Sequence, residues 1–274
     1  MSDAVLFSII AAGGVALVAA GYWLYGRRLR RTTRPRLEQA ASLLGGDFDL
    51  GRRTASGQLE GYAVRVRLHS FHSVDALGQG ETSEWAEIHC KLPKGVAQSM
   101  LLRLRSQREA DTKLSRDGRL VDLILGHGSF DGAHVVEGAP EDLVRGLLTA
   151  EVCGIIAANG VRVDLPDHGS DDELRLTIEN WPTPEALSQC LALAARLSKR
   201  AGEVLTAAEQ AIAEGAAALG QVPAEAVLAV RAERTREIAE VAAMAASRNR
   251  RSIMIGVALT AAIVGLALLF VKFS

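Results

Sequence analysis

Cysteine is scarce in this sequence: its 274 residues include three, Cys90, Cys153 and Cys190, and no Cys-x-x-Cys pair. The odd number and wide spacing argue against a disulfide framework, and the missing pair removes a common metal and redox motif. Cys153 and Cys190 lie within apolar helical patterns, where a free thiol behaves as a small hydrophobic side chain. We therefore predict that both pack in the core.

The sequence also lacks the short motifs that identify a reaction or a ligand. Gly126-x-Gly128 has neither the lysine of a Walker loop nor the third glycine of a dinucleotide fold. The same segment contains residue types of a catalytic triad, but without the pattern Gly-x-Ser-x-Gly. A glycine-rich turn between two strands explains the same residues without any chemistry and is the preferred interpretation. If the domain binds a ligand, we expect it at this loop, through His127, Ser129, Asp131 and His134.

Neither a metal nor a cofactor is expected from the histidines. His69 and His72 are three apart on a predicted strand, so their side chains point to opposite faces. His89 lies near a strand end without an obvious carboxylate partner. The question of enzyme activity stays open, and the missing catalytic signature favours a protein that is not an enzyme.

Two stretches, 4–26 and 253–271, lack charged residues, and each is long enough to cross a hydrocarbon core of about 30 Å. Arginines flank both on the side of the central segment, which predicts that this segment is cytoplasmic and that both termini lie outside. Tyr22, Trp23 and Tyr25 stand where an aromatic belt would contact the headgroups. The flanking basic residues are Arg27, Arg28, Arg30, Arg31, Arg248, Arg250 and Arg251.

These features predict a multi-pass protein of a bacterial inner (plasma) membrane, divided into eight segments. They are an external N-terminus 1–3, transmembrane helix 4–26, basic collar 27–36, cytoplasmic α+β domain 37–200, helical hairpin or stalk 201–247, basic collar 248–252, transmembrane helix 253–271 and external C-terminus 272–274.

The central segment is acidic. The chain has 31 basic and 32 acidic residues, and nine of the basic residues are arginines of the two collars. Nucleic acid is therefore excluded as a partner, because its phosphates would repel the domain.

The hydrophobic pattern of the central segment predicts an α+β domain on an antiparallel sheet. A short helix with Leu37 and Leu44 on its apolar face ends at Gly45-Gly46. Alternation over 62–69 puts Val64, Val66 and Leu68 on one face of a strand. Further strands are predicted at 85–92, 101–105, 161–165 and 173–179, helices at 140–159 and from Thr183-Pro184 onward, and a turn near 215–223.

The leading hypothesis from the sequence is a two-span membrane protein that presents a cytoplasmic protein-binding or scaffold domain. Its partners would be the lipid bilayer and another protein, with a homo-oligomer left open. The alternative is a membrane-tethered enzyme or small-ligand sensor that uses the Gly126–Gly138 loop. The helices of 201–247 form either an antiparallel hairpin or a loose coiled coil on this pattern.

Overall fold

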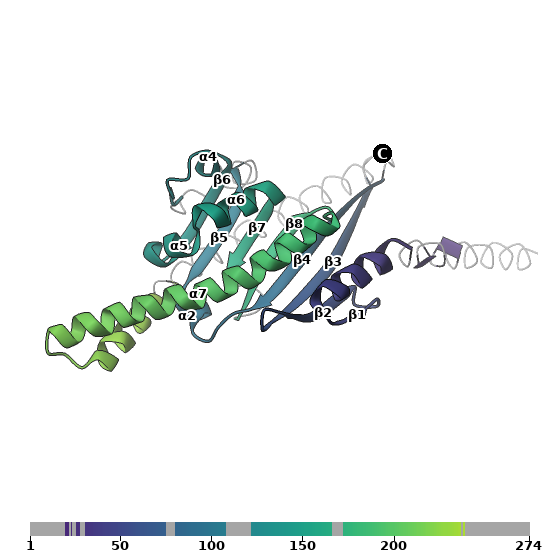
Figure 1. Cartoon of the computed structure of the whole chain (residues 1–274). Coiled ribbons are helices and arrows are strands. Elements are labelled where there is room, and N and C mark those ends of the chain that lie inside the picture. The colour runs from purple at the N-terminus through teal and green to yellow at the C-terminus, as the bar shows by residue number, and fades with distance from the viewer. Residues whose placement is uncertain are drawn as a thin grey trace, which may run out of the picture. The chain divides into compact units, whose positions relative to one another are not determined.

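The computed structural model describes residues 31–74, 80–107, 122–165 and 172–236, together with 20, 21, 23, 26, 27 and 238. In this part of the chain the fold is α+β (Figure 1). Eight strands form one sheet in the order β1-β2-β3-β4-β8-β7-β5-β6. The strand pairs for which a register is defined are all antiparallel. The predicted α+β class and antiparallel sheet are thus confirmed.

The chain divides into two compact units. The first unit comprises Met1–Lys91, Ile155–Arg162 and Glu173–Ser198. The second comprises Leu92–Gly154, Val163–Asp172 and Lys199–Ser274.

The first unit contains the helix over 31–44 and five strands. These strands are β1 (Asp47–Asp49), β2 (Thr54–Leu59), β3 (Tyr62–Val74), β4 (Gly80–Lys91) and β8 (Glu173–Glu179). The unit also includes the first half of α7 (Pro184–Ala218).

One face of these strands is apolar and buried. The register pairs Val66 with Ile88 and Ile88 with Leu176, and the exposed fraction of each is 0%. Leu37 and Leu44 of the helix over 31–44 and Leu187 of α7 are also buried. Figure 1 shows both helices on the same side of these strands. This alternation confirms the predicted inward face of β3 and leaves the opposite face to polar side chains.

The helices of the first unit begin and end with the predicted signals. Gly45 has φ +57°, and the N–H groups of Gly45 and Gly46 donate to the carbonyls of Ser42 and Ala41. These two bonds are the pattern of a Schellman motif. At the start of α7, the Thr183 hydroxyl accepts a hydrogen bond from the Ala186 N–H at 3.3 Å, as an N-cap residue does.

The second unit holds shorter elements around β5, β6 and β7. Its elements are α2 (Val96–Ser99), β5 (Leu101–Ser106), α4 (Ser129–Ala133), β6 (His134–Ala139), α5 (Glu141–Leu147), the start of α6 (Ala150–Asn159) and most of β7 (Val161–Leu165). The predicted single helix over 140–159 is wrong, because Leu148 and Thr149 separate α5 from α6.

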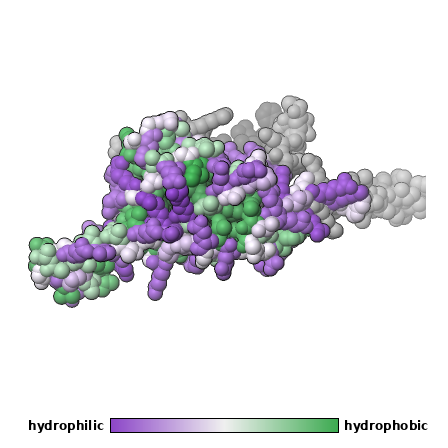
Figure 2. All heavy atoms as spheres, in the orientation of Figure 1, coloured by the Kyte–Doolittle hydropathy of each residue, from purple (hydrophilic) through white to green (hydrophobic). Residues whose placement is uncertain are grey.

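A helical hairpin closes the described part of the second unit. Helix α7 ends at Ala218, Gly220 adopts φ +72°, and a second helix covers 223–236. The turn is where the sequence predicted it. Arg231 joins the two helices by donating to both Glu209 carboxylate oxygens, at 2.6 and 2.7 Å. Figure 2 shows hydrophobic residues at the tip of this hairpin, where Leu219, Val222 and Leu228 are exposed.

The prediction of two membrane-spanning helices is corrected. Among the described residues, none of the helices is long and apolar enough to cross a bilayer. The longest, α7, carries Lys199, Arg200, Glu203 and Glu209 along its length, so it is amphipathic. The predicted two-span topology, inner-membrane location and membrane-presented scaffold function are therefore not supported.

The residues on which the membrane prediction was based fall almost entirely outside the described part. This applies to most of 4–26, to 253–271 and to Tyr22, Tyr25, Arg28, Arg30, Arg248, Arg250 and Arg251. Trp23 is described and is 62% exposed, and the Arg27 guanidinium lies 5.3 Å from its ring centroid. Arg31 is exposed at the start of the helix over 31–44.

Candidate functional site

In the predicted ligand loop, the described side chains make contacts that hold the loop itself together. Asp131 accepts backbone N–H bonds from Leu125, Gly126 and His127 at 3.0, 2.8 and 2.7 Å. Partial burial raises the pKa of Asp131, but these three donors outweigh it and the net pKa is lowered. Asp131 therefore organises the turn before α4 as a carboxylate.

The other predicted residues of this loop contact backbone carbonyls or are exposed. His127 Nε2 is 3.1 Å from the Leu148 carbonyl oxygen, and His134 Nδ1 is 3.3 Å from that of Phe130. The His134 ring stacks on Phe130, whereas Ser129 is exposed at the start of α4. The ligand-binding role predicted for these residues stays a prediction.

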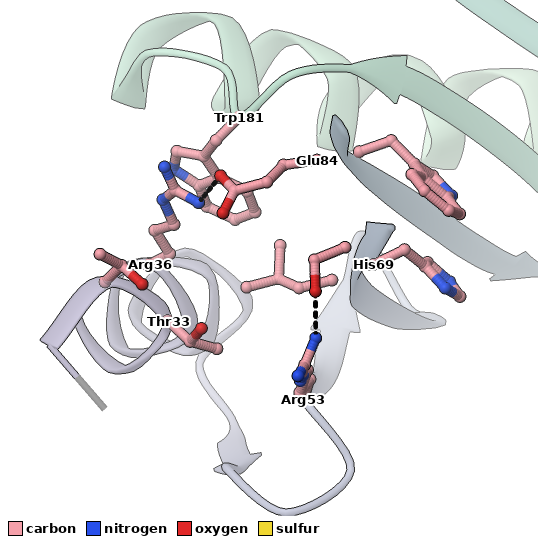
Figure 3. A pocket seen from close by; sticks show the side chains of 10 residues that line it. Thr33, Arg36, Arg53, His69, Glu84 and Trp181 are labelled. Carbon is pink, nitrogen blue, oxygen red and sulfur yellow. Dashed lines mark hydrogen bonds and ion pairs between the residues drawn. The ribbon is translucent and has the colours of Figure 1, made fainter. Parts of the chain in front are cut away.

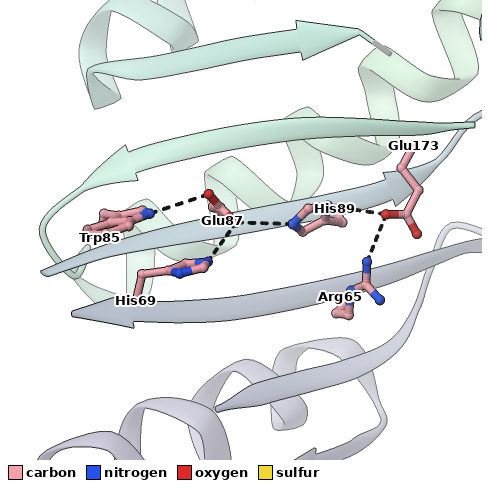
Figure 4. Close-up of polar contacts among 6 residues, drawn as sticks. All are labelled: Arg65, His69, Trp85, Glu87, His89 and Glu173. Atoms are coloured by element: carbon pink, nitrogen blue, oxygen red, sulfur yellow. Dashed lines mark hydrogen bonds and ion pairs between the residues drawn. The ribbon is translucent and has the colours of Figure 1, made fainter. Parts of the chain in front are cut away.

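A group of polar side chains lies on the polar face of the first unit's sheet (Figure 4). The sequence did not predict that these residues meet. The group comes from β3, β4 and β8, on the face opposite Val66, Ile88 and Leu176. We call it the histidine–glutamate cluster, and it consists of Arg65, His69, Trp85, Glu87, His89 and Glu173.

Glu87 is the centre of this cluster. Its Oε2 lies 2.7 Å from His69 Nε2 and 3.5 Å from His89 Nε2, and its Oε1 lies 3.5 Å from Trp85 Nε1. The His69 and Trp85 rings are parallel, with centroids 5.0 Å apart. A carboxylate in contact with two imidazoles fixes both ring positions and stays ionised.

The buried His89 connects Glu87 to a second carboxylate. His89 Nδ1 lies 3.3 Å from Glu173 Oε2, which also accepts a hydrogen bond from Arg65 at 2.9 Å. The expectation that His89 lacks a carboxylate partner is therefore wrong. Glu87 precedes His89 by two residues, so both side chains point to the same face of β4. The two-residue period of a strand could therefore have predicted this partner. Glu173 comes from β8, and no sequence pattern links it to His89.

The environment of Glu87 strongly favours its charged form. Burial raises the pKa of this carboxyl, but the contact with His89, the charge and hydrogen bond of His69 and the charge of Arg175 lower it from 4.5 to about 2. A carboxyl with a depressed folded-state pKa stabilises the fold above its unfolded pKa, and this stability is lost as pH falls through the folded value.

Replacing Glu87 with glutamine should therefore remove a pH-dependent part of the stability. At pH 7 we expect a loss of about 2 kcal/mol, because one pKa unit is worth about 1.4 kcal/mol and water screens part of the effect. The difference between the wild type and Glu87→Gln should shrink steadily as pH falls from about 4.5 toward 2, measured by urea denaturation. Glu225→Gln, at an exposed helical position, is the control, and an equal pH dependence in both variants would refute the assignment.

The described residues contain no group of three His, Cys, Asp or Glu residues that could hold a metal ion. The three cysteines are buried, as predicted for Cys153 and Cys190. Burial is the main cause that raises the pKa of each thiol to about 11. The thiols therefore stay protonated at neutral pH.

A small hollow lies on the face of the β3–β4 pair opposite the histidine–glutamate cluster, against the helix over 31–44 (Figure 3). We call it the arginine hollow, and its cavity volume is about 30 Å³. Figure 3 shows that the side chain of His69 points away from it. Its lining residues are Thr32, Thr33, Arg36, Arg53, Leu68, His69, Ser70, Glu84, Trp85 and Trp181.

Two arginines and one tryptophan face each other across the arginine hollow. Arg36 Nη1 donates to Glu84 Oε2 at 2.6 Å, and the Arg36 guanidinium lies 5.8 Å from the Trp181 ring centroid. Arg53 Nη1 donates to the Ser70 hydroxyl at 2.6 Å. These contacts fix the orientation of both guanidinium groups.

The backbone that presents two of these side chains is strained. Arg53 has φ +54°, and Asn180, directly before Trp181, has φ +64°. Arginine seldom adopts this left-handed conformation, which costs it on the order of 1 kcal/mol, whereas asparagine adopts it more readily. Hydrogen bonds hold it in place: the Leu68 N–H donates to the Arg53 carbonyl and the Asn180 N–H to the Glu84 carbonyl, both at 3.0 Å.

The sequence of the chain matches no protein family model and no curated protein.

Proposed function

We propose that this protein recognises another protein, and that the arginine hollow anchors the partner. The observation that carries this proposal is the meeting at one hollow of Arg53, whose backbone is left-handed, and Trp181, which directly follows the left-handed Asn180. Strain of this kind persists where surrounding contacts enforce it, and it occurs preferentially at functional sites.

The composition of the hollow is that of an interface anchor. Tryptophan and arginine are the residue types most enriched among those that dominate protein–protein binding energy. Arg36, Arg53 and Trp181 gather at one hollow, and hydrogen bonds already restrain both arginines. A partner would therefore lose little binding energy to ordering these side chains.

The size of the hollow supports a protein partner over a metabolite. Sites for small molecules are typically cavities of about 300–1,000 Å³. The arginine hollow, at about 30 Å³, accommodates one or two waters or the tip of a single side chain.

A second candidate function, acid–base catalysis, is favoured by one observation. His69 Nε2 lies 2.7 Å from Glu87 Oε2, the arrangement of a general base and the carboxylate that orients it. This pair faces the other side of the β3–β4 strands from the arginine hollow. Catalysis there requires a substrate site beside His69, and loss of a measured activity in His69→Gln would establish it.

Partner capture by the full-length protein tests the main proposal. Trp181→Ala should weaken binding of a captured partner by about 30-fold, the size of an interface hot spot of about 2 kcal/mol. Leu228→Ala, which truncates an exposed hydrophobic residue of the hairpin, is the matched control and should leave binding unchanged. Circular dichroism establishes that both variants fold. If binding survives Trp181→Ala, or depends instead on Leu228, the proposal is wrong.

A further inference from the structure

We infer that two copies of this chain associate by exchanging the helix over 223–236, which we call the hairpin helix. In each copy this helix leaves its own α7 and docks on the equivalent surface of the second copy. The residues concerned belong to the second unit, so the arginine hollow is not involved. Three features of this unit point to the exchange: the fit of the hairpin helix, its loose attachment and the exposed turn before it.

The hairpin helix is complementary to the surface on which it lies. This docking surface comprises Gln98 of α2, Asp142 of α5 and Glu209 of α7. The Arg231 guanidinium donates to both carboxylate oxygens of Glu209, at 2.6 and 2.7 Å, a paired contact that also fixes orientation. The Thr235 hydroxyl oxygen lies 3.3 Å from the Gln98 carbonyl oxygen. The same contacts form when a second copy supplies the helix, so the surface accepts either one.

The attachment of the hairpin helix to its own chain is weak. Within 223–236 only Arg234 is buried. Its Nη2 lies 3.6 Å from Asp142 Oδ2, and its Nη1 has no hydrogen-bond partner in the part of the chain that the structure describes. Burying a guanidinium without hydrogen bonds costs free energy, and water screens the half-exposed Arg231 where it pairs with Glu209. The helix can therefore be released at a small cost.

The turn before the hairpin helix leaves apolar side chains in water. Leu219 and Val222 are 76% and 55% exposed at the tip that Figure 2 shows. When two copies exchange their helices, the opened turns lie between the copies, and each can cover the apolar side chains of the other. A single copy has no such cover. Short connections of this kind act as hinges in exchanged dimers, so the partner that this surface fits is a second copy.

Sedimentation equilibrium of the full-length protein tests the role of the turn. The wild type should show a monomer–dimer equilibrium. Gly220→Ala should lower the dissociation constant about 25-fold, because alanine disfavours φ +72° about fivefold in each of the two turns that open. Gly215→Ala is the matched control. A Cβ meets nothing within 4 Å at either glycine, but Gly215 lies inside α7 without a positive φ, so the dissociation constant should stay unchanged.

Reversed charges test which helix docks on which surface. Arg231→Glu sets two carboxylates against each other, and Glu209→Arg sets two guanidinium groups against each other. In a mixture of the two variants, each hairpin helix meets the opposite charge on the other copy, and both contacts return. The mixed dimer should therefore be about 100-fold tighter than the dimer of either variant, roughly tenfold for each contact. Energy transfer between differently labelled variants measures it, and circular dichroism establishes that each variant folds.

Three results would each overturn the inference. They are a wild type that stays monomeric, a dissociation constant that Gly220→Ala leaves unchanged or raises, and a mixture in which the mixed dimer is no tighter than the others. A dimer that responds neither to Gly220 nor to the reversed charges is held together by another surface.

Discussion

Replacing Gly46 with alanine should destabilise the protein by about 3 kcal/mol, at the upper end of the cost of overpacking. Gly46 follows the helix over 31–44 and lies against β2. A Cβ atom there would stand 2.0 Å from the Ser56 carbonyl oxygen and 2.7 Å from the Gly57 Cα. Both obstacles are backbone atoms, so no side-chain rotation can relieve the contact. Urea denaturation followed by circular dichroism measures the loss.

The close approach is reciprocal, and this excludes an easy rearrangement. A Cβ on Gly57 would lie 2.5 Å from the Leu44 carbonyl oxygen and 2.8 Å from the Leu44 Cβ. The helix end and β2 therefore meet through two glycines, where glycine permits backbones to approach. Gly215→Ala is the control, because a Cβ at this position of α7 meets nothing within 4 Å. It should stabilise the helix by about 0.5–1 kcal/mol. A change of less than about 1 kcal/mol for Gly46→Ala would contradict the packing argument.

Much of the fold could be predicted from the sequence because its signals are local. The strands over 161–165 and 173–179 have the bounds that their apolar alternation indicates. Thr183 caps α7, and Gly45 ends the first helix in a left-handed conformation. In each case the residues that determine the structure lie within a few positions of one another.

The candidate site could not be predicted, because its parts are distant in the sequence. Arg36 and Glu84 meet across 48 positions, and Trp181 comes from the segment after β8. The contacts among these three residues depend on the register of the strands and on how the helix over 31–44 packs against the sheet. The alternation of apolar and polar residues determines neither. Apolar alternation also says nothing about Arg53, whose left-handed backbone is set by the hydrogen bonds around it.

The glycine-rich loop shows why composition alone is a weak guide to a binding site, and the ligand-binding role predicted for it stays a prediction. Its polar residues contact backbone groups: Asp131 accepts three N–H bonds of the loop, His134 lies against the Phe130 carbonyl, and His127 lies against the more distant Leu148 carbonyl. A segment with several glycines has many exposed backbone groups, so it requires side-chain partners of this kind. Composition alone does not distinguish this need from a binding site.

Arg103→Met should cost about 3–5 kcal/mol, because it leaves two buried carboxylates without their central cation. Arg103 of β5 stands opposite Glu137 of β6 and Asp164 of β7 in the register, so the three side chains share one face. Each residue is 8% exposed. Burial lowers the pKa of Arg103, and the charges of Asp164 and Glu137 act against this. Differential unfolding in urea at pH 7 gives the cost.

A triple variant separates the attraction within this group from the cost of burying it. When Arg103→Met is combined with Glu137→Gln and Asp164→Asn, no charge is left unbalanced, and most of the lost stability should return. The single variant should also recover stability as pH falls, because protonation neutralises the abandoned carboxylates and removes their desolvation cost. If the single variant lost less than about 1 kcal/mol, or if the triple variant were less stable still, the three residues would not form a coupled charge group. The recovery in acid is the decisive measurement, since a simple loss of packing at Arg103 would not depend on pH.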